Sequence, residues 1–123
     1  MTRQILIVDD EKDLLDLTKT FFETFDFDVA VASSGEEALA ILEHDSFGVI
    51  FLDLKMPGMD GVELCKLIRE RDAEVTIYAV TGYHEIYPPE ACRQAGFDDY
   101  FNKPVSLHLL HNAALRAFEK HPG

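Results

Sequence analysis

Apolar residues along this chain gather in short runs, and the stretches between the runs carry apolar residues every three or four positions. Four of the runs are apolar and a fifth is short and aromatic; they cover residues 5–8, 29–32, 47–52, 75–80 and 99–102. Runs of this length are typical of β-strands, and unbroken apolar runs are typical of strands buried on both faces. Spacings of three and four are typical of helices with one apolar side. The pattern therefore predicts strands and helices in strict alternation.

The first and last helices are predicted from a stripe of apolar side chains. In the first helix the stripe is formed by Leu14, Leu17, Phe21 and Phe25, so we expect this side to face the sheet. The last helix carries a similar stripe, at Leu107, Leu110, Ala114 and Phe118.

The three middle helices are predicted from the signals at their ends. The second has two candidate capping boxes, which begin at Ser33 and Ser34 and are completed by glutamates three residues later. Asp60 has the same spacing to a glutamate at the start of the third helix. The fourth helix is expected to be short, 90–95, because prolines precede it and Gly96 follows it.

Alternation of strands and helices through short loops predicts a parallel sheet with right-handed crossovers and helices on both faces. We expect an α/β fold, a three-layer flavodoxin-like (βα)5 sandwich whose five-stranded parallel sheet has the order 2-1-3-4-5. The length of 123 residues predicts one domain, 1–123. In this order strands 1, 3, 4 and 5 lie side by side, so the residues at their carboxyl ends meet at one edge of the sheet.

Charge and apolar content limit the classes of partner. The formal charge of −12 argues against binding of nucleic acid or of an anionic membrane by this domain. The apolar runs are too short to span a membrane, and the first is too short for a signal peptide, so we expect a cytoplasmic protein. The two cysteines, Cys65 and Cys92, are expected to be buried free thiols.

Residues that can carry chemistry stand at four of the predicted strand ends. Asp9 and Asp10 follow the first strand, Asp53 ends the third, Thr81 ends the fourth and Lys103 follows the fifth. Two carboxylates 4 Å apart repel by about 4 kcal/mol at an effective dielectric of 20, so the cluster needs raised pKa values or a bound cation. Oxygen ligands without a nearby histidine or cysteine suit Mg²⁺. A carboxylate, a divalent metal, a lysine and a hydroxyl are the groups needed to form and hold an acyl phosphate.

The same strand ends carry four short motifs: D-D-E at 9–11, D-L-K-M-P-G-M-D-G at 53–61, T-G at 81–82 and K-P at 103–104. With these motifs in register, the whole chain resembles the receiver domain of two-component response regulators, and it is similar in extent to the single-domain chemotaxis regulator. The resemblance implies a phospho-accepting signalling switch and not an enzyme that turns over a small metabolite.

The resemblance implies a phosphoacceptor and a metal site. In that family the aspartate that matches Asp53 takes a phosphoryl group from the phosphohistidine of a histidine kinase or of a histidine phosphotransfer protein. The acids that match Asp9 and Asp10 hold Mg²⁺, together with Asp53 and the backbone carbonyl at Lys55.

The resemblance also implies how the signal leaves the site. Thr81 and Lys103 match residues that contact the phosphoryl oxygens, and the peptide bond between Lys103 and Pro104 is expected to be cis. Tyr100 matches the family's switch aromatic, through which phosphorylation alters the surface formed by helix 4, strand 5 and helix 5. An unknown output domain or protein would read that surface. We expect a monomer or a weak dimer.

Two variable positions of the family are expected to set the lifetime of the phosphorylated state. They lie two residues beyond Asp53 and Thr81 and are occupied here by Lys55 and Tyr83. The attacking water must approach Asp53 in line with the leaving oxygen, and both side chains are expected to project over that path.

Two other functions occur on folds of this kind. An Mg²⁺-dependent phosphohydrolase that acts through an aspartyl-phosphate commonly has a second aspartate two residues after the first, where this chain has Lys55. A flavin-binding domain should have a first loop rich in Ser, Thr and Gly that cradles phosphate, whereas Asp9, Asp10 and Glu11 would repel it. The phosphohydrolase is therefore the alternative that stays open.

Overall fold

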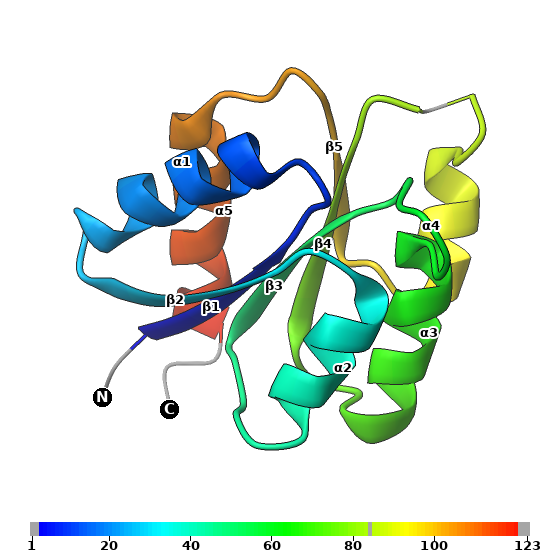
Figure 1. Ribbon diagram of the computed structural model, residues 1–123, viewed down its shortest axis with the longest axis horizontal. Helices are drawn as coiled ribbons and strands as arrows, with labels where there is room; N and C mark the ends of the chain where they lie inside the picture. The colour runs from blue at the N-terminus through cyan, green and yellow to red at the C-terminus, as the bar shows by residue number, and fades with distance from the viewer. Residues whose placement is uncertain (1–2, 84, 121–123) are drawn as a thin grey trace.

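The computed structural model describes residues 3–83 and 85–120 and is a three-layer α/β sandwich (Figure 1). The parallel sheet has the order β2-β1-β3-β4-β5, as the sequence predicts. Helices α1 and α5 cover one face, and α2, α3 and α4 cover the other. The elements are β1 Arg3–Val8, α1 Lys12–Glu23, β2 Phe27–Ala32, α2 Gly35–Leu42, β3 Val49–Asp53, α3 Gly61–Arg71, β4 Thr76–Thr81, α4 Pro89–Ala95, β5 Asp99–Asn102 and α5 Leu107–Lys120.

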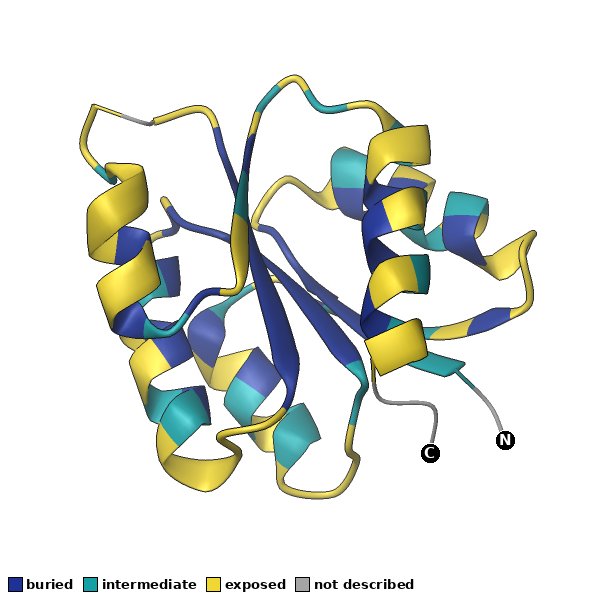
Figure 2. Ribbon diagram, turned by 180° about the vertical axis from the view of Figure 1, so that it is seen from behind, coloured by how far each residue is buried: buried dark blue, intermediate teal, exposed yellow. Residues whose placement is uncertain are grey.

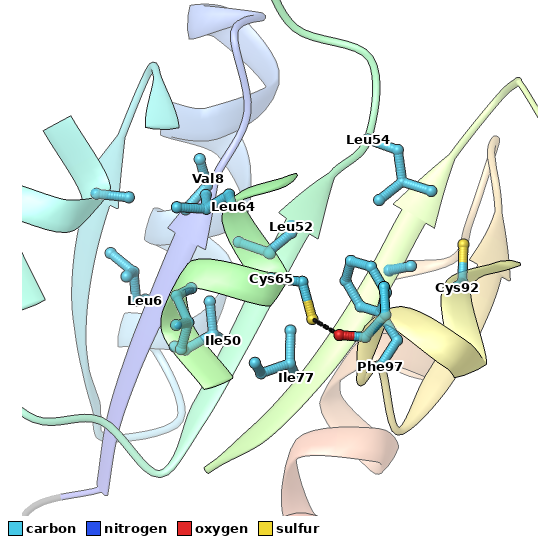
Figure 3. Packing of buried hydrophobic residues seen from close by; sticks show 14 of the residues in the cluster. Leu6, Val8, Ile50, Leu52, Leu54, Leu64, Cys65, Ile77, Cys92 and Phe97 are labelled. Carbon is cyan, nitrogen blue, oxygen red and sulfur yellow. Dashed lines mark hydrogen bonds between the residues drawn. The ribbon is translucent and has the colours of Figure 1, made fainter. Parts of the chain in front are cut away.

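The sheet separates two apolar cores, and its central strands contribute to both. All residues of β3 and β4 are buried, which confirms that these runs are strands covered on both faces (Figure 2). Ile50 and Leu52 point toward α2, α3 and α4, where Cys65 and Phe97 also pack (Figure 3). Phe51 packs on the other side, among the residues of α1 and α5. This double burial holds the end of β3 rigidly in the middle of the molecule.

The predicted buried side of the first helix is only partly correct: Leu14 and Phe21 are half-buried, and Phe21 packs against the core. The buried residues of α1 are Leu15, Thr18 and Phe22, whereas Leu17 is 58% exposed and Phe25, beyond the end of the helix, is 39% exposed. The contacting side is therefore rotated relative to the apolar stripe. Thr18 can be buried because its hydroxyl donates to the Leu14 carbonyl at 2.8 Å, so a polar residue occupies a core position.

The end signals predicted for the other helices are confirmed. Ser34, not Ser33, is the N-cap of α2, since its side chain accepts a hydrogen bond from the backbone N–H of Glu37 at 3.1 Å. Asp60 caps α3 through the backbone N–H of Glu63 at 2.8 Å. Helix α4 ends at Gly96, which has the left-handed φ of 114° that favours glycine.

Other local predictions are also confirmed. The Lys103–Pro104 peptide bond is cis, and Cys65 and Cys92 are buried free thiols. Across the described residues, 3–83 and 85–120, there is no helix with the length and apolar character needed to cross a membrane.

Arg69 of α3 ties three segments together at the edge of the sheet remote from the strand-end acids. Its guanidinium donates to the carbonyl of Gly96, at 2.8 and 2.9 Å, and to the carbonyl of Val75. It also pairs with the carboxylate of Asp98 at 2.9 Å, and that carboxylate accepts the backbone N–H of Ile77. One side chain thus satisfies the carbonyl that ends α4 and fixes the starts of β4 and β5.

We expect Arg69→Met to lower the free energy of unfolding by roughly 2 kcal/mol, because it removes the guanidinium that donates to these carbonyls and pairs with Asp98. Urea denaturation followed by circular dichroism measures the change. Arg93→Met is the matched control: Arg93 is 71% exposed and pairs with Glu90 on the same helix, so its loss should cost less than about 0.5 kcal/mol. Equal losses in the two variants would contradict the role given to Arg69.

Candidate functional site

The carboxyl ends of four adjacent strands bring the predicted site residues together. Asp9 follows β1, Asp53 is the last residue of β3, Thr81 is the last residue of β4 and Lys103 follows β5. Asp53 is 6% exposed and Thr81 is fully buried, so both lie at the floor of the site. A cleft of about 660 Å³ opens above Asp53, and Asp10 lies in its wall.

Three carboxylates and the ammonium of Lys103 form one charged cluster at these strand ends. Asp9, Asp10 and Asp53 each present an oxygen, and these oxygens all lie within 4.8 Å of one another. The Lys103 ammonium lies 3.2 Å from Asp9 Oδ2 and 3.6 Å from Asp53 Oδ2. The backbone N–H of Glu11 donates to Asp9 Oδ1 at 2.9 Å and fixes that carboxylate. One lysine does not neutralise three acids, and hard oxygen donors at this spacing can hold a divalent metal ion.

The pKa values of Asp53 and Lys103 are both raised in this cluster. Burial raises the pKa of Asp53 to about 7, and the nearby charges of Asp9 and Asp10 act in the same direction, while Lys103 opposes them. For Lys103, burial alone would lower the pKa, but the carboxylates of Asp53 and Asp9 outweigh burial and raise it. The lysine is therefore firmly protonated, and Asp53 is the carboxylate whose charge is most in need of a cation.

Thr81 is oriented by the loop that follows it. Its Oγ1 accepts a hydrogen bond from the backbone N–H of Tyr83 at 3.0 Å. This contact uses a lone pair of the oxygen, so the hydroxyl proton can be donated to another acceptor. Thr81 is next to Asp53 across the β3–β4 pair, where Asp53 is in register with Val80.

The two variable residues contact each other in the wall of the cleft. The ammonium of Lys55 lies 4.2 Å from the centre of the Tyr83 ring, a cation–π contact, and both side chains are exposed. The sequence places each of them near Asp53 but contains no signal that they stack on one another.

Tyr100 is half-buried and hydrogen-bonded, and its partner was not predicted. Its hydroxyl donates to the backbone carbonyl of Tyr87, in the loop between β4 and α4, at 3.0 Å. Tyr87 is one of several aromatic residues in that loop, and the sequence gives no reason to choose it from the others. Only the loop's path over β5 brings the two tyrosines together.

The fold and the groups at its strand ends define a receiver-type α/β domain. A sequence profile of the response regulator receiver domain matches residues 5–115. The chain belongs to this family, as the motifs at 9–11, 53–61, 81–82 and 103–104 indicate.

Known relatives agree with this membership. The alkaline phosphatase synthesis transcriptional regulatory protein PhoP of Bacillus subtilis is 37% identical over 95% of this chain, which spans 48% of that protein's length. A CheY-like receiver domain from Methanospirillum hungatei has 32% identity and a TM-score of 0.91, over 99% of this chain and 98% of that one. The response regulator TrrA of Thermotoga maritima, solved in complex with Mg²⁺-BeF, has 27% identity and a TM-score of 0.84, over 94% of this chain and 99% of that one.

We expect Asp53 in the metal-free protein to titrate near pH 7, because burial penalises its charged form. A folded-state pKa above the unfolded value of about 3.9 stabilises the fold fully below about pH 4, and this contribution is lost as the pH rises through 7. A ¹³C NMR titration of the carboxyl carbon with a chelator present measures the pKa, and added Mg²⁺ should lower it.

The matched stability measurement is urea denaturation of metal-free protein between pH 4 and 8. Asp53→Asn removes the titrating group, so its stability should fall less over this range than that of the wild type. An ordinary Asp53 pKa near 4 would contradict the electrostatic account of the site.

Proposed function

We propose that this domain is a phosphorylation switch in which Asp53 accepts a phosphoryl group from a phosphohistidine. The observation that carries the proposal is the position of Asp53: it ends the central buried strand, lies 3.6 Å from the Lys103 ammonium and shares one cluster of oxygens with Asp9 and Asp10. Membership of the receiver family supports the same reading.

Each residue of the site has a role in that transfer. An oxygen of Asp53 attacks phosphorus, the bond between phosphorus and the donor imidazole nitrogen breaks, and its electron pair stays on that nitrogen. Lys103 stabilises the negative charge on the phosphoryl oxygens, and Thr81 donates its hydroxyl to one of them.

The metal of this proposal is Mg²⁺. Asp9, Asp10, Asp53 and the backbone carbonyl of Lys55 would hold it, and when bound it supplies positive charge that offsets the phosphoryl oxygens. Two observations support this choice: the oxygens of the three acids lie within 4.8 Å of one another, and the related TrrA was solved with Mg²⁺-BeF.

A hydrolase that acts on outside phosphate esters is disfavoured by the residue two positions after Asp53. Such enzymes commonly have a second aspartate there, which acts as the general acid for the leaving oxygen. Lys55 occupies the position, and its ammonium lies over the ring of Tyr83. On this proposal the site promotes only the phosphorylation and dephosphorylation of its own Asp53.

The partners proposed are a histidine kinase or a histidine phosphotransfer protein in the cytoplasm, and an output partner that reads the surface of α4, β5 and α5. Curated relatives such as PhoP and the C4-dicarboxylate transport regulator DctD of Rhizobium meliloti are named as transcriptional regulatory proteins, and the chain spans 48% and 25% of their lengths. Output through a further domain or through a separate protein is therefore part of the proposal. The acidic charge of −12 argues against direct nucleic-acid binding by the receiver itself.

The switch is proposed to run from Thr81 to Tyr100. A phosphoryl group adds up to two negative charges and three acceptor oxygens at Asp53. Thr81, on the neighbouring strand, then moves to donate to one of these oxygens, and the half-buried Tyr100 ring, one strand further on, changes position in response. A ring with two packed positions is the two-state element that a switch needs.

We expect Asp53→Asn to abolish phosphorylation and Asp10→Asn to slow it strongly, because the first removes the acceptor and the second removes a proposed metal ligand. Intact-mass analysis after incubation with acetyl phosphate and Mg²⁺ reads out the addition of one phosphoryl group. Asp45→Asn, an exposed acid in the loop before β3 at the opposite end of the sheet, is the matched control and should be labelled like the wild type. Equal labelling of the Asp53 variant would refute the assignment.

We expect Tyr83→Ala to hasten dephosphorylation by roughly two- to fivefold, the range given by an exposed cation–π contact of about 0.5–1 kcal/mol. The variant removes the ring that is proposed to shield the water path, and the same ring is the one that the Lys55 ammonium contacts. The decay of phosphorylated protein is followed by mass after removal of acetyl phosphate.

Two further variants sharpen this measurement. Lys55→Met removes the ammonium and keeps an apolar stem, and Ile86→Ala removes a 60% exposed side chain of the same loop that does not line the cleft. Unchanged decay in both the Tyr83 and Lys55 variants, or equal acceleration in the Ile86 variant, would argue against a gate at this position.

A further inference from the structure

Tyr87 makes hydrogen bonds at both of its ends, to two different parts of the fold. Its hydroxyl donates to Asp60 Oδ2 at 3.4 Å, at the start of α3. Its backbone carbonyl accepts the hydroxyl of Tyr100 at 3.0 Å, on β5. Tyr87 is half-buried, whereas its neighbours Ile86 and Pro88 are exposed, so it is the residue through which this part of the loop is attached to the molecule.

The Asp60 end of this connection is fixed to the strand that carries Asp53. The other carboxylate oxygen of Asp60 caps α3, and the next residue, Gly61, donates its N–H to the Leu54 carbonyl at 2.8 Å. Gly61 lies so close to β3 that a Cβ there would collide with the backbone carbonyl oxygen of Asp53. Asp60 therefore holds a constant position relative to Asp53.

The backbone of Tyr87 is also linked to Thr81. The backbone N–H of Tyr87 donates to the Tyr83 carbonyl at 3.0 Å, and the backbone N–H of Tyr83 donates to Thr81 Oγ1 at 3.0 Å. With the bond from Tyr100 to the Tyr87 carbonyl, three hydrogen bonds and the backbones of Tyr83 and Tyr87 connect Thr81 to Tyr100 on β5.

The Tyr87 hydroxyl remains a donor under ordinary conditions. Burial raises its pKa, and the adjacent carboxylate of Asp60 raises it further, so the phenol stays protonated. A hydrogen bond from a phenol to a carboxylate is of the charge-assisted kind, although at 3.4 Å it is a long one.

We propose that Tyr87 is a positioning residue of the switch: anchored by its hydroxyl to Asp60, it fixes the carbonyl that holds Tyr100 and so determines how far a movement of Thr81 reaches β5 and α4. The inference deepens the proposed function and rests on it. Without the anchor, the loop can shift and Tyr100 can leave its acceptor whether or not Asp53 is phosphorylated. The difference between the two states at Tyr100 then becomes smaller.

The test compares Tyr87→Phe with Tyr78→Phe. Both variants lose one phenolic hydroxyl, because Tyr78 donates to the Ala113 carbonyl at 3.0 Å, but Tyr78 packs against α5 on the other face of the sheet. NMR of the tyrosine rings and backbone amides, with and without Mg²⁺ and beryllium fluoride, measures the change at Tyr100 and α4. Tyr87→Phe should shift the equilibrium between the two Tyr100 positions by roughly two- to tenfold, the effect of one hydrogen bond, and should reduce the response at Tyr100.

A second variant tests the anchor from its other end. Asp60→Ser keeps an N-cap oxygen for α3 but is too short to reach Tyr87, so it should reduce the Tyr100 response in the same way. The double variant Tyr87→Phe/Asp60→Ser should then lose no more of the Tyr100 response than either single variant does. A full response in Tyr87→Phe, an equal loss in Tyr78→Phe, or additive losses in the double variant would each overturn the inference.

Failure of the proposed function gives a different result from failure of this inference. A wild-type protein that gains no mass with acetyl phosphate and shows no response to beryllium fluoride overturns the proposed function and the role of Tyr87 with it. A wild-type protein that responds at Tyr100, beside a Tyr87→Phe variant that responds equally and is still phosphorylated on Asp53, overturns the role of Tyr87 alone.

Discussion

The arrangement of this domain depends on an excess of negative charge at the ends of two adjacent strands, β1 and β3. Asp53 is 6% exposed, the carboxylates of Asp9 and Asp10 lie within 4.8 Å of it, and the ammonium of Lys103 lies beside it. Burial and like charge both disfavour ionised Asp53, which raises its pKa to about 7. Any added cation therefore gains a large electrostatic advantage here, and any added phosphoryl group must be accommodated by movement of the neutral or positive groups around it.

The scaffold maintains this excess of charge because it keeps the acids from moving apart. Strand β3 is buried over its whole length between two apolar cores, and Gly61 packs directly on the backbone of Asp53. Arg69 secures the remote edge of the sheet by bonding to segments of α4, β4 and β5. The rigid parts of the molecule thus hold the charges, and the response to a change in charge is left to the loop between β4 and α4.

Among the described residues, the loop between β4 and α4 is held to the rest of the molecule mainly by contacts of Tyr83 and Tyr87. Tyr83 stacks under Lys55 in the wall of the cleft, while Tyr87 reaches Asp60 on one side and Tyr100 on the other. The same segment therefore lines the cleft beside Asp53 and contacts the half-buried ring on β5. On the proposed function, the lifetime of the phosphorylated state and the output would therefore depend on residues that are close together in this loop.

The sequence by itself determined the order of the elements, the strand order and the residues at the strand ends, because apolar period, caps and breakers are local signals. It named Asp53, Thr81 and Lys103 from motifs, and the family membership supports that set. The tertiary structure decided which side of α1 is buried, since a core position at Thr18 depends on a hydrogen bond that no apolar pattern records. It also decided that Tyr87 meets Asp60, a contact between residues 27 positions apart. Such contacts follow from the path of the chain in space, and the local pattern of polar and apolar residues does not encode them.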